Sequence, residues 1–145
     1  MMPSEKRFMG STVSLAAHLT LAVTAGAVFV GCSVRLSDVH GSVLIDDKPA
    51  PPGLKVTFAP QTAEGEPVLS ATDTEGRYRL IHRSGKTGIR PGRYSVSLGH
   101  WGDPATNPPE LSSLKLPPDV REGTSTLVCD VLMGGTQYDI RVRTR

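Results

Sequence analysis

Polar and apolar residues alternate along most of the chain beyond residue 37, and turns containing glycine or proline separate the alternating segments. Alternation with a period of two after a turn signal is typical of half-buried β-strands. The clearest example is Ala71–Leu98, where two glycine turns each precede an alternating segment. We interpret these two segments as strands joined by a loop into a central hairpin. The whole pattern predicts seven strands, at Asp38–Ile45, Leu54–Phe58, Val68–Thr72, Arg77–Ile81, Arg93–Leu98, Thr124–Val131 and Gln137–Val142.

Seven short strands, with turns at close spacing and no helical stretch, predict an all-β fold, a seven-stranded antiparallel β-sandwich. The 15 glycines, 12 prolines and low aromatic content agree with a domain that has many turns. Asp47 is expected to adopt the left-handed conformation in the turn after the first strand. Tyr94 begins a strand directly after a Pro-Gly turn, and we expect its hydroxyl to bond back to that turn, as in a tyrosine corner.

The segment Gly99–Pro118 breaks the alternating pattern. It contains Trp101 and five prolines and has no periodicity. A connection of this length is uncommon in a compact domain and is either functional or disordered. Trp101 is therefore the candidate contact for a protein partner or a sugar ring. The alternative is that Trp101 folds back over the end of the sandwich as a lid.

Residues 1–31 have the pattern of a secretory signal. Lys6 and Arg7 precede an uncharged stretch, and the stretch ends in Phe29-Val30-Gly31-Cys32-Ser33. This ending resembles the lipobox of bacterial lipoproteins. The resemblance implies cleavage before Cys32, a diacylglyceryl group on its sulfur, and a protein held on the periplasmic or outer-surface side of a membrane. We therefore expect a signal peptide over 1–31, a lipidated tether over 32–37 and a β-sandwich domain over 38–145. A transmembrane anchor or a conventionally cleaved signal remains the alternative.

Lipidation of Cys32 would leave Cys129 without an intramolecular partner. Cys129 shares one strand face with Leu127 and Val131, so we expect a small buried thiol rather than a reactive one. A Cys32–Cys129 disulfide is the alternative if lipidation does not occur.

The formal net charge of +2 is too small to indicate nucleic acid as a partner. The cations near the central hairpin favour a solvated strand face and loop, and an anionic partner such as lipid head groups or acidic glycan is the functional alternative. These cations are Arg77, Arg79, Arg83, Lys86, Arg90 and Arg93.

Sequence motifs for catalysis or metal binding are missing: there is no phosphate-binding loop, no nucleophile elbow and no pair of histidines spaced as metal ligands. We therefore expect no catalytic residue, no metal and no cofactor. Asp73 and Glu75 suggest half of a calcium loop, but a turn stabilised by the Asp73 side chain is the simpler interpretation.

The ordered set of strand and turn motifs resembles the small bacterial lipoproteins, planctomycete type, that carry a carboxypeptidase regulatory-like (transthyretin-like) domain. The resemblance covers nearly all of the chain after Cys32, and it implies a Greek-key sandwich of the transthyretin/prealbumin type in the cell envelope. It implies no particular activity. The motifs are Val39-x-Gly41-x-Val43-x-x-Asp46-x-Lys48-Pro49, Gly53-x-x-Val56-x-Phe58-x-Pro60, Thr72-Asp73-x-x-Gly76-x-Tyr78, Pro91-Gly92-x-Tyr94-x-Val96, Leu116-Pro117, Thr124-Ser125-x-Leu127 and Tyr138-x-Ile140.

These observations together predict a non-enzymatic, lipid-anchored envelope protein whose β-sandwich is an interaction or structural module. Its expected partners are the membrane, through the lipid on Cys32, and an envelope protein or glycan. The first alternative is a carbohydrate-binding module in which Trp101 stacks on a sugar. An enzyme with an unrecognised site ranks last, because no nucleophile–base pair is visible in the sequence.

Overall fold

The computed structural model describes residues 35–62 and 65–145. The chain divides into two units, Met1–Cys32 and Ser33–Arg145, and all of the described residues belong to the second. The predicted signal peptide and the predicted lipidation site Cys32 lie outside the described residues. Within the described ranges, no helix is both long enough and apolar enough to cross a membrane.

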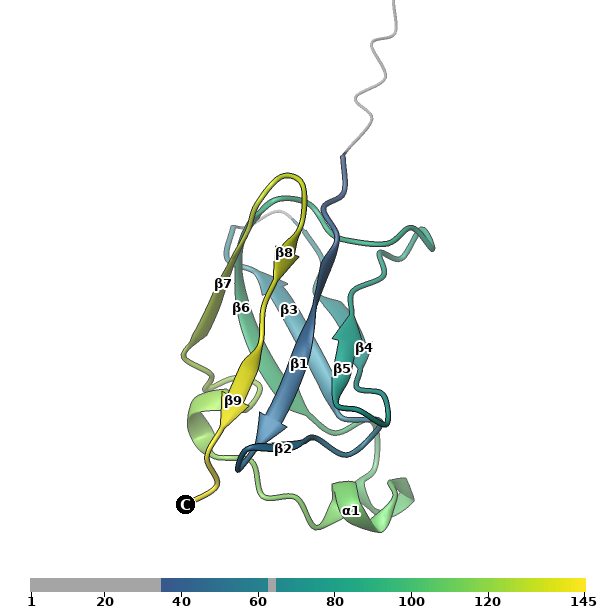
Figure 1. Ribbon diagram of the computed structural model, residues 1–145, viewed down its shortest axis with the longest axis vertical. Helices are drawn as coiled ribbons and strands as arrows, with labels where there is room; N and C mark the ends of the chain where they lie inside the picture. The colour runs from purple at the N-terminus through teal and green to yellow at the C-terminus, as the bar shows by residue number, and fades with distance from the viewer. Residues whose placement is uncertain (1–34, 63–64) are drawn as a thin grey trace, which may run out of the picture. The chain divides into compact units, whose positions relative to one another are not determined.

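The second unit consists of two β-sheets packed face to face (Figure 1), which confirms the all-β sandwich. The first sheet is built around β1, with β2 and β5 on one path and β8 and β9 also paired to β1. The second sheet has the order β4-β3-β6-β7. The strands are β1 (Val39–Ile45), β2 (Lys48–Pro49), β3 (Lys55–Pro60), β4 (Val68–Ala71), β5 (Arg77–Arg79), β6 (Gly92–Gly99), β7 (Leu127–Val131), β8 (Thr136–Gln137) and β9 (Ile140–Val142).

The predicted central hairpin is wrong, because its two strands lie in different sheets. β5 pairs with β1, whereas β6 pairs with β3 and β7. Alternation shows which face of each strand is buried, and both strands do bury theirs: Tyr78 of β5 and Tyr94 of β6 reach the core. It does not show which strand is the neighbour. The long connection between β5 and β6 crosses from the first sheet to the second, so the buried faces of these two strands meet across the core.

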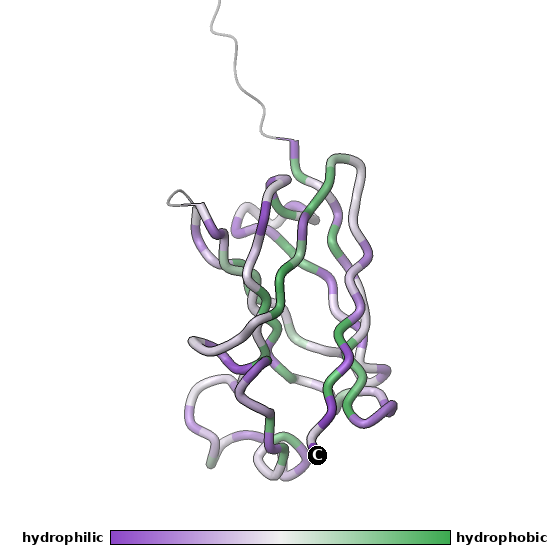
Figure 2. The backbone as a smooth tube through the Cα atoms, turned by 90° about the vertical axis from the view of Figure 1, so that its left-hand side faces the viewer, coloured by the Kyte–Doolittle hydropathy of each residue, from purple (hydrophilic) through white to green (hydrophobic). Residues whose placement is uncertain are grey.

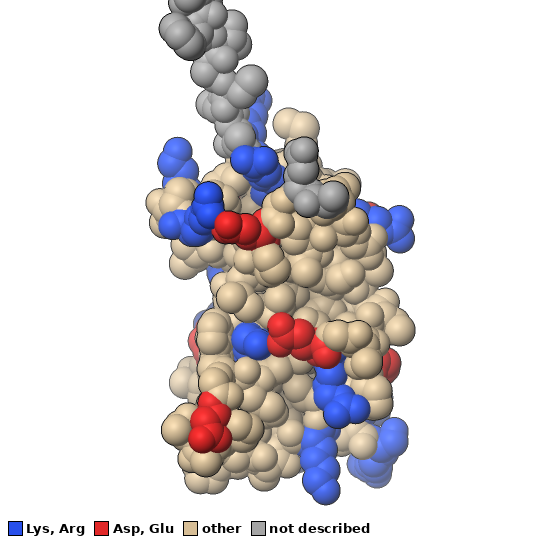
Figure 3. All heavy atoms as spheres, turned by 180° about the vertical axis from the view of Figure 1, so that it is seen from behind, with Lys and Arg blue, Asp and Glu red and all other residues tan. Residues whose placement is uncertain are grey.

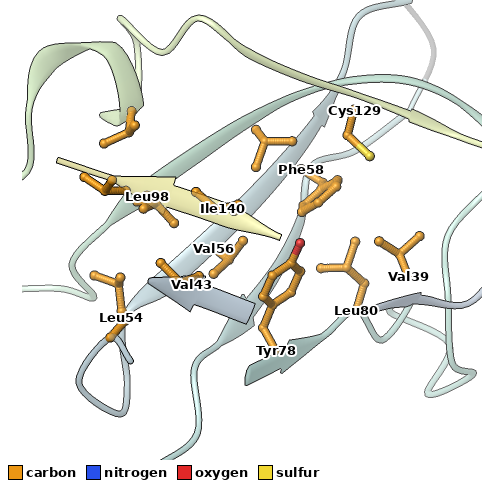
Figure 4. Close-up of a cluster of buried hydrophobic side chains, with 14 of the residues drawn as sticks. Val39, Val43, Leu54, Val56, Phe58, Tyr78, Leu80, Leu98, Cys129 and Ile140 are labelled. Atoms are coloured by element: carbon orange, nitrogen blue, oxygen red, sulfur yellow. The ribbon is translucent and has the colours of Figure 1, made fainter. Parts of the chain in front are cut away.

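The centre of the core is Phe58, which is fully buried on β3. Its ring lies 6.0 Å from that of Tyr78, 6.2 Å from that of Tyr94 and 6.2 Å from that of Tyr138, measured between centroids. These are tilted or edge-on arrangements, in which the edge of one ring faces the π-cloud of another. Figure 4 shows Phe58 and Tyr78 between aliphatic side chains from both sheets, with Cys129 beside them. The alternating positions Val39 and Val43 of β1 and Val56 and Phe58 of β3 are all fully buried.

The last strand differs from the predicted antiparallel arrangement, because β8 and β9 run parallel to β1. The register is the same on both sides of the break between them, since His40 faces Gln137 and Val43 faces Ile140. The break is therefore a local turning of the backbone at Tyr138 and Asp139 and not an inserted residue.

Two side chains stabilise the backbone at this break. The buried Tyr78 hydroxyl donates a short hydrogen bond to the carbonyl oxygen of Tyr138. The Asp139 carboxylate accepts hydrogen bonds from the backbone N–H of Ser42 (2.8 Å) and from its hydroxyl (2.9 Å). Side chains thus satisfy backbone groups that would otherwise lose their partners where the ladder is interrupted.

Gly41 provides the space for this arrangement. A Cβ atom at Gly41 would lie 1.9 Å from the Tyr138 carbonyl oxygen, a distance that no real Cβ contact shows. The requirement is therefore close approach of two backbones and not an unusual φ angle.

Two predicted turns are confirmed in detail. The Tyr94 hydroxyl donates to the carbonyl oxygen of Arg90 at 2.8 Å, as in a tyrosine corner. Asp47 has a φ of 64°, and Asp46 is also left-handed with a φ of 49°. Both residues lie in the turn that joins β1 to β2, and Asp is among the few non-glycine types that adopt this conformation readily.

The Asp73 turn has the simpler of the two expected structures. One oxygen of the Asp73 carboxylate accepts from the backbone N–H of Glu75 (2.8 Å) and of Arg77 (2.9 Å). The Arg77 guanidinium pairs with both Asp73 and Glu75. The acidic side chains of this turn are therefore directed to Arg77 and to the turn backbone.

The segment Gly99–Pro118 is ordered and contains short helical turns, which the sequence pattern did not predict. They are η1 (Pro104–Thr106), α1 (Pro109–Ser112) and η2 (Pro118–Val120). Each begins with proline, whose restricted φ suits the first turn of a helix. The segment is attached to the sandwich by the buried side chains of Leu111, Leu116 and Val120. The sparse apolar positions therefore serve as anchors.

We expect Gly41→Ala to destabilise the domain by about 3 kcal/mol, at the upper end of single-substitution effects, because the new methyl group would displace the last strand from β1. Urea denaturation would measure the loss. The control is His40→Ala on the same strand, whose side chain faces outward and is expected to cost under about 1 kcal/mol. Equal effects of the two substitutions would contradict the close approach at Gly41.

We also expect the Asp139 carboxylate to make stability depend on acid. Partial burial opposes its ionisation, but hydrogen bonds from Ser42 and Gln137 and the charge of Arg141 together lower its pKa. A carboxyl whose pKa is lower in the folded state stabilises the fold above its unfolded pKa, about 3.9 for Asp, and this contribution is lost as the pH falls through the folded pKa. Asp139→Asn should therefore flatten the stability profile below about pH 4. Urea denaturation of the wild type and the variant at a series of pH values would measure this change, and identical acid limbs would contradict the role of the Asp139 carboxylate.

Candidate functional site

The second sheet carries a groove on its outer face, and Trp101 lies at its border. The groove has a volume of about 500 Å³. We call it the outer-face groove. Figure 3, which views this face, shows an uncharged stretch of surface below the upper end and neighbouring basic and acidic groups at mid-height. The groove is lined by Lys55, Thr57, Ala59, Pro67, Leu69, Ser95, Ser97, Trp101, Glu122, Gly123 and Ser125.

Small side chains form the floor of the outer-face groove because of the strand alternation. Val56 and Phe58 of β3 face the core, so Thr57 faces outward. In the same way Ser95 and Ser97 of β6 are the outward positions. The strand register places Thr57 between Leu69 of β4 and Ser97 of β6. The sheet is hollow at this point because its outward residues are small.

One hydroxyl group in the floor is unpaired. The Thr57 side chain is 4% exposed, and its Oγ1 atom has no hydrogen-bond partner among the described residues. Leaving a buried hydroxyl unpaired costs about 1–3 kcal/mol. The Thr57 hydroxyl therefore has unused hydrogen-bonding capacity, but the atom is covered and lies beneath the surface of the groove.

An ion pair borders the groove at the Trp101 end. The Lys55 Nζ atom lies 2.8 Å from Glu122 Oε2, and the Lys55 side chain is only 16% exposed. Both side chains lie against Gly99, where an added Cβ would be 3.2 Å from the Lys55 stem and 3.7 Å from the Glu122 carboxylate. The chain leaves β6 at this point and reaches Trp101 two residues later.

Trp101 is 41% exposed and is not buried as a lid over the sandwich end. Its segment is held by local hydrogen bonds: the Trp101 carbonyl oxygen accepts from Asn107 Nδ2 at 3.2 Å, and Asp103 caps η1 through the N–H of Ala105 at 2.9 Å. An exposed indole on a held segment provides a preorganised apolar contact.

The structure brings Trp101 together with residues that the sequence did not single out, above all Thr57, Ser97 and the Lys55–Glu122 pair. Alternation did mark Thr57, Ser95 and Ser97 as outward positions. It did not show that β3 and β6 are neighbours, and without that pairing the hydroxyl groups do not form one surface.

Cys129 is a small buried thiol, as the sequence predicted. Cys129 is a free cysteine and is 2% exposed on β7. Burial, with a smaller effect of the Asp130 charge, raises its pKa to about 11. The thiol is therefore protonated near neutral pH, and it packs as a small apolar group.

The cations assigned to the central hairpin do not form one cluster. Arg77 pairs with Asp73 and Glu75, and Arg79 pairs with Asp38 on the first sheet. The other two ion pairs join Arg83 to Glu66 and Arg93 to Asp130. The four arginines are exposed and lie on two different sheets and a loop, which agrees with the solvated strand face and loop favoured from the sequence.

No family model, no curated protein and no solved structure matches this chain. In the described part of the chain, no three His, Cys, Asp or Glu side chains come together as metal ligands would. The ionisable side chains that line the outer-face groove are Lys55 and Glu122, which pair with each other.

Proposed function

We propose that this protein is a lipid-anchored cell-envelope protein, attached to a membrane through Cys32, whose β-sandwich is a non-catalytic binding module. The outer-face groove is its binding surface, and Trp101 is the principal contact. The observation that carries this proposal is the combination, on one face, of an exposed tryptophan with a floor of hydroxyl groups. The lipobox-like sequence before Cys32 supports the anchor.

The composition of the groove favours binding over catalysis. Acyl, glycosyl and phosphoryl transfer each depend on a positioned base, nucleophile or pair of carboxylates. Of the described residues, those that line the groove include three serines and a threonine but no histidine, and the single carboxylate is paired with Lys55. Such a surface can donate and accept hydrogen bonds without transferring a proton.

The anchoring part of the proposal predicts that Cys32→Ala releases the protein from membranes, because the lipid is attached through the thiol. Fractionation of cells that produce the wild-type and variant chains would measure this release. Cys129→Ala is the matched control and should stay with the membrane, since Cys129 is buried in the core. Retention of Cys32→Ala in the membrane fraction would exclude a lipid anchor at Cys32.

A second candidate, carbohydrate binding, is favoured by the particular chemistry of the groove. A sugar ring presents an apolar face, which stacks on an aromatic ring, and hydroxyl groups at its edge, which need partners. Trp101 would provide the stacking surface, and Ser95 and Ser125, which are half-buried, the hydroxyl partners. The Lys55–Glu122 pair adds a charged donor and acceptor at the same end of the groove.

This second candidate predicts that envelope polysaccharide quenches or shifts the fluorescence of Trp101, the single tryptophan of the chain. Ser95→Ala removes a half-buried hydroxyl of the groove, so it should weaken binding about tenfold. Thr87→Val, on an exposed loop away from the groove, is the control. Unchanged fluorescence at saturating polysaccharide would favour a protein partner over a sugar.

A further inference from the structure

We propose that one end of the sandwich rests on the surface of an anionic bilayer, the same membrane that holds the lipid on Cys32. We call this end the tether end and define it by residues 35–37, 81–91 and 132–135. The inference rests on the proposed lipidation of Cys32 and adds to it a second, reversible contact, made by the folded domain itself.

Backbone contacts bring the three segments of the tether end together. Ser37 exchanges two hydrogen bonds with Ile89, at 2.7 and 2.9 Å. The N–H of Thr136 donates to the carbonyl oxygen of Asp38 at 2.8 Å, which places the 132–135 turn beside the start of β1. In Figure 1 these segments lie at the upper end of the sandwich, and α1 lies at the lower end.

Exposed apolar side chains concentrate at the tether end. Five large apolar side chains are exposed in the described part of the chain. Leu69 and Trp101 border the outer-face groove, and the other three belong to the tether end: Ile81 is 55% exposed, Leu132 64% and Met133 70%. Leu132 and Met133 lie on the β7–β8 turn, which is hydrophobic at the upper end of the tube in Figure 2. Neither position is needed for the core.

The segments of the tether end also carry exposed basic side chains. Arg35, Lys86 and Arg90 are exposed, and the described residues offer none of them an ion-pair partner. The acidic side chains nearby are already matched, since Glu66 pairs with Arg83 and Asp130 with Arg93. Figure 3 shows lysine and arginine atoms at the upper end, with an acidic group beside them, and further basic atoms at the lower end. Apolar tips with a cationic border are the combination that binds the interface of an anionic bilayer.

The tether between Cys32 and the domain is short, so a lipid on Cys32 would keep the tether end close to the membrane. Five residue steps separate Cys32 from Ser37, and a fully extended chain of that length spans no more than about 18 Å. Ser37 is already part of the folded domain. A lipid on Cys32 would therefore hold the tether end at a high local concentration beside the bilayer, where even weak contacts are populated. The lipid would not raise the local concentration of a soluble protein partner in this way.

Docking in this way would orient the binding groove. β6 runs from Gly92, which faces Val131 near the tether end, to Gly99, which leads to Trp101. Trp101 and the Lys55–Glu122 pair would then point away from the bilayer. The domain would present its groove outward and would not rotate freely on its tether.

The experiment uses the full chain, lipidated in cells and reconstituted in vesicles of equal parts phosphatidylcholine and phosphatidylglycerol. An environment-sensitive fluorophore is attached at Met133→Cys or, as the matched control, at Ala105→Cys in η1 at the other end. The buried Cys129 does not react in the folded protein. We expect blue-shifted emission and quenching by nitroxide lipids at position 133, and neither effect at position 105.

A charge reversal tests the basic border. Lys86→Glu with Arg90→Glu should abolish the shift at position 133, whereas Lys115→Glu with Arg121→Glu at the other end should preserve it. Identical emission at positions 133 and 105, in protein that sediments with the vesicles, would overturn the docking and leave the lipid anchor intact. Wild-type protein that carries no lipid and does not sediment would overturn the anchor, and with it the docking.

Discussion

The structure depends on the contact between the last strand and the first. The Tyr138 carbonyl group turns inward over Gly41, where a side chain of any size would collide with it, and the buried Tyr78 hydroxyl donates to that carbonyl. Asp139 meanwhile bonds the free N–H of Ser42. This contact joins the last strand of the sandwich to β1, and Tyr78 of β5 takes part in it. It also brings Tyr138 to Phe58, so closure of the sheet and packing of the aromatic core are one event.

The outer-face groove follows from the same core. Residues of β3 and β6 that fill the interior alternate with residues that face away from it, and on these two strands the outward residues are small and hydroxylated. The core requires large side chains at Phe58 and Leu98 but sets no requirement at Thr57 or Ser97. The outer face was therefore free to acquire a hollow, an unpaired hydroxyl and a neighbouring tryptophan. The same holds for the exposed apolar residues at the two ends of the sandwich: the core requires neither Met133 nor Trp101 to be apolar.

Local patterns predicted much of this fold. Alternation correctly marked the buried faces, and turn residues correctly marked the left-handed Asp47 and the Tyr94 corner, because each depends on residues close together in the sequence. Strand partners were not predictable in this way: β5 and β6 look like a hairpin, and β9 looks like an antiparallel strand. Of the residues in the candidate groove, the sequence singled out Trp101 but not Thr57, Ser97 or the Lys55–Glu122 pair. These residues come together only through pairings between distant segments.

Crosslinking in intact cells, with a tagged wild-type chain and a tagged Trp101→Ala chain compared side by side, would test whether the outer-face groove binds a partner. We expect a discrete crosslinked species, protein or glycan, that the wild type forms and the variant loses while remaining folded and in the membrane fraction. A crosslinked species of equal yield in both chains would contradict the assignment of the outer-face groove as the binding surface.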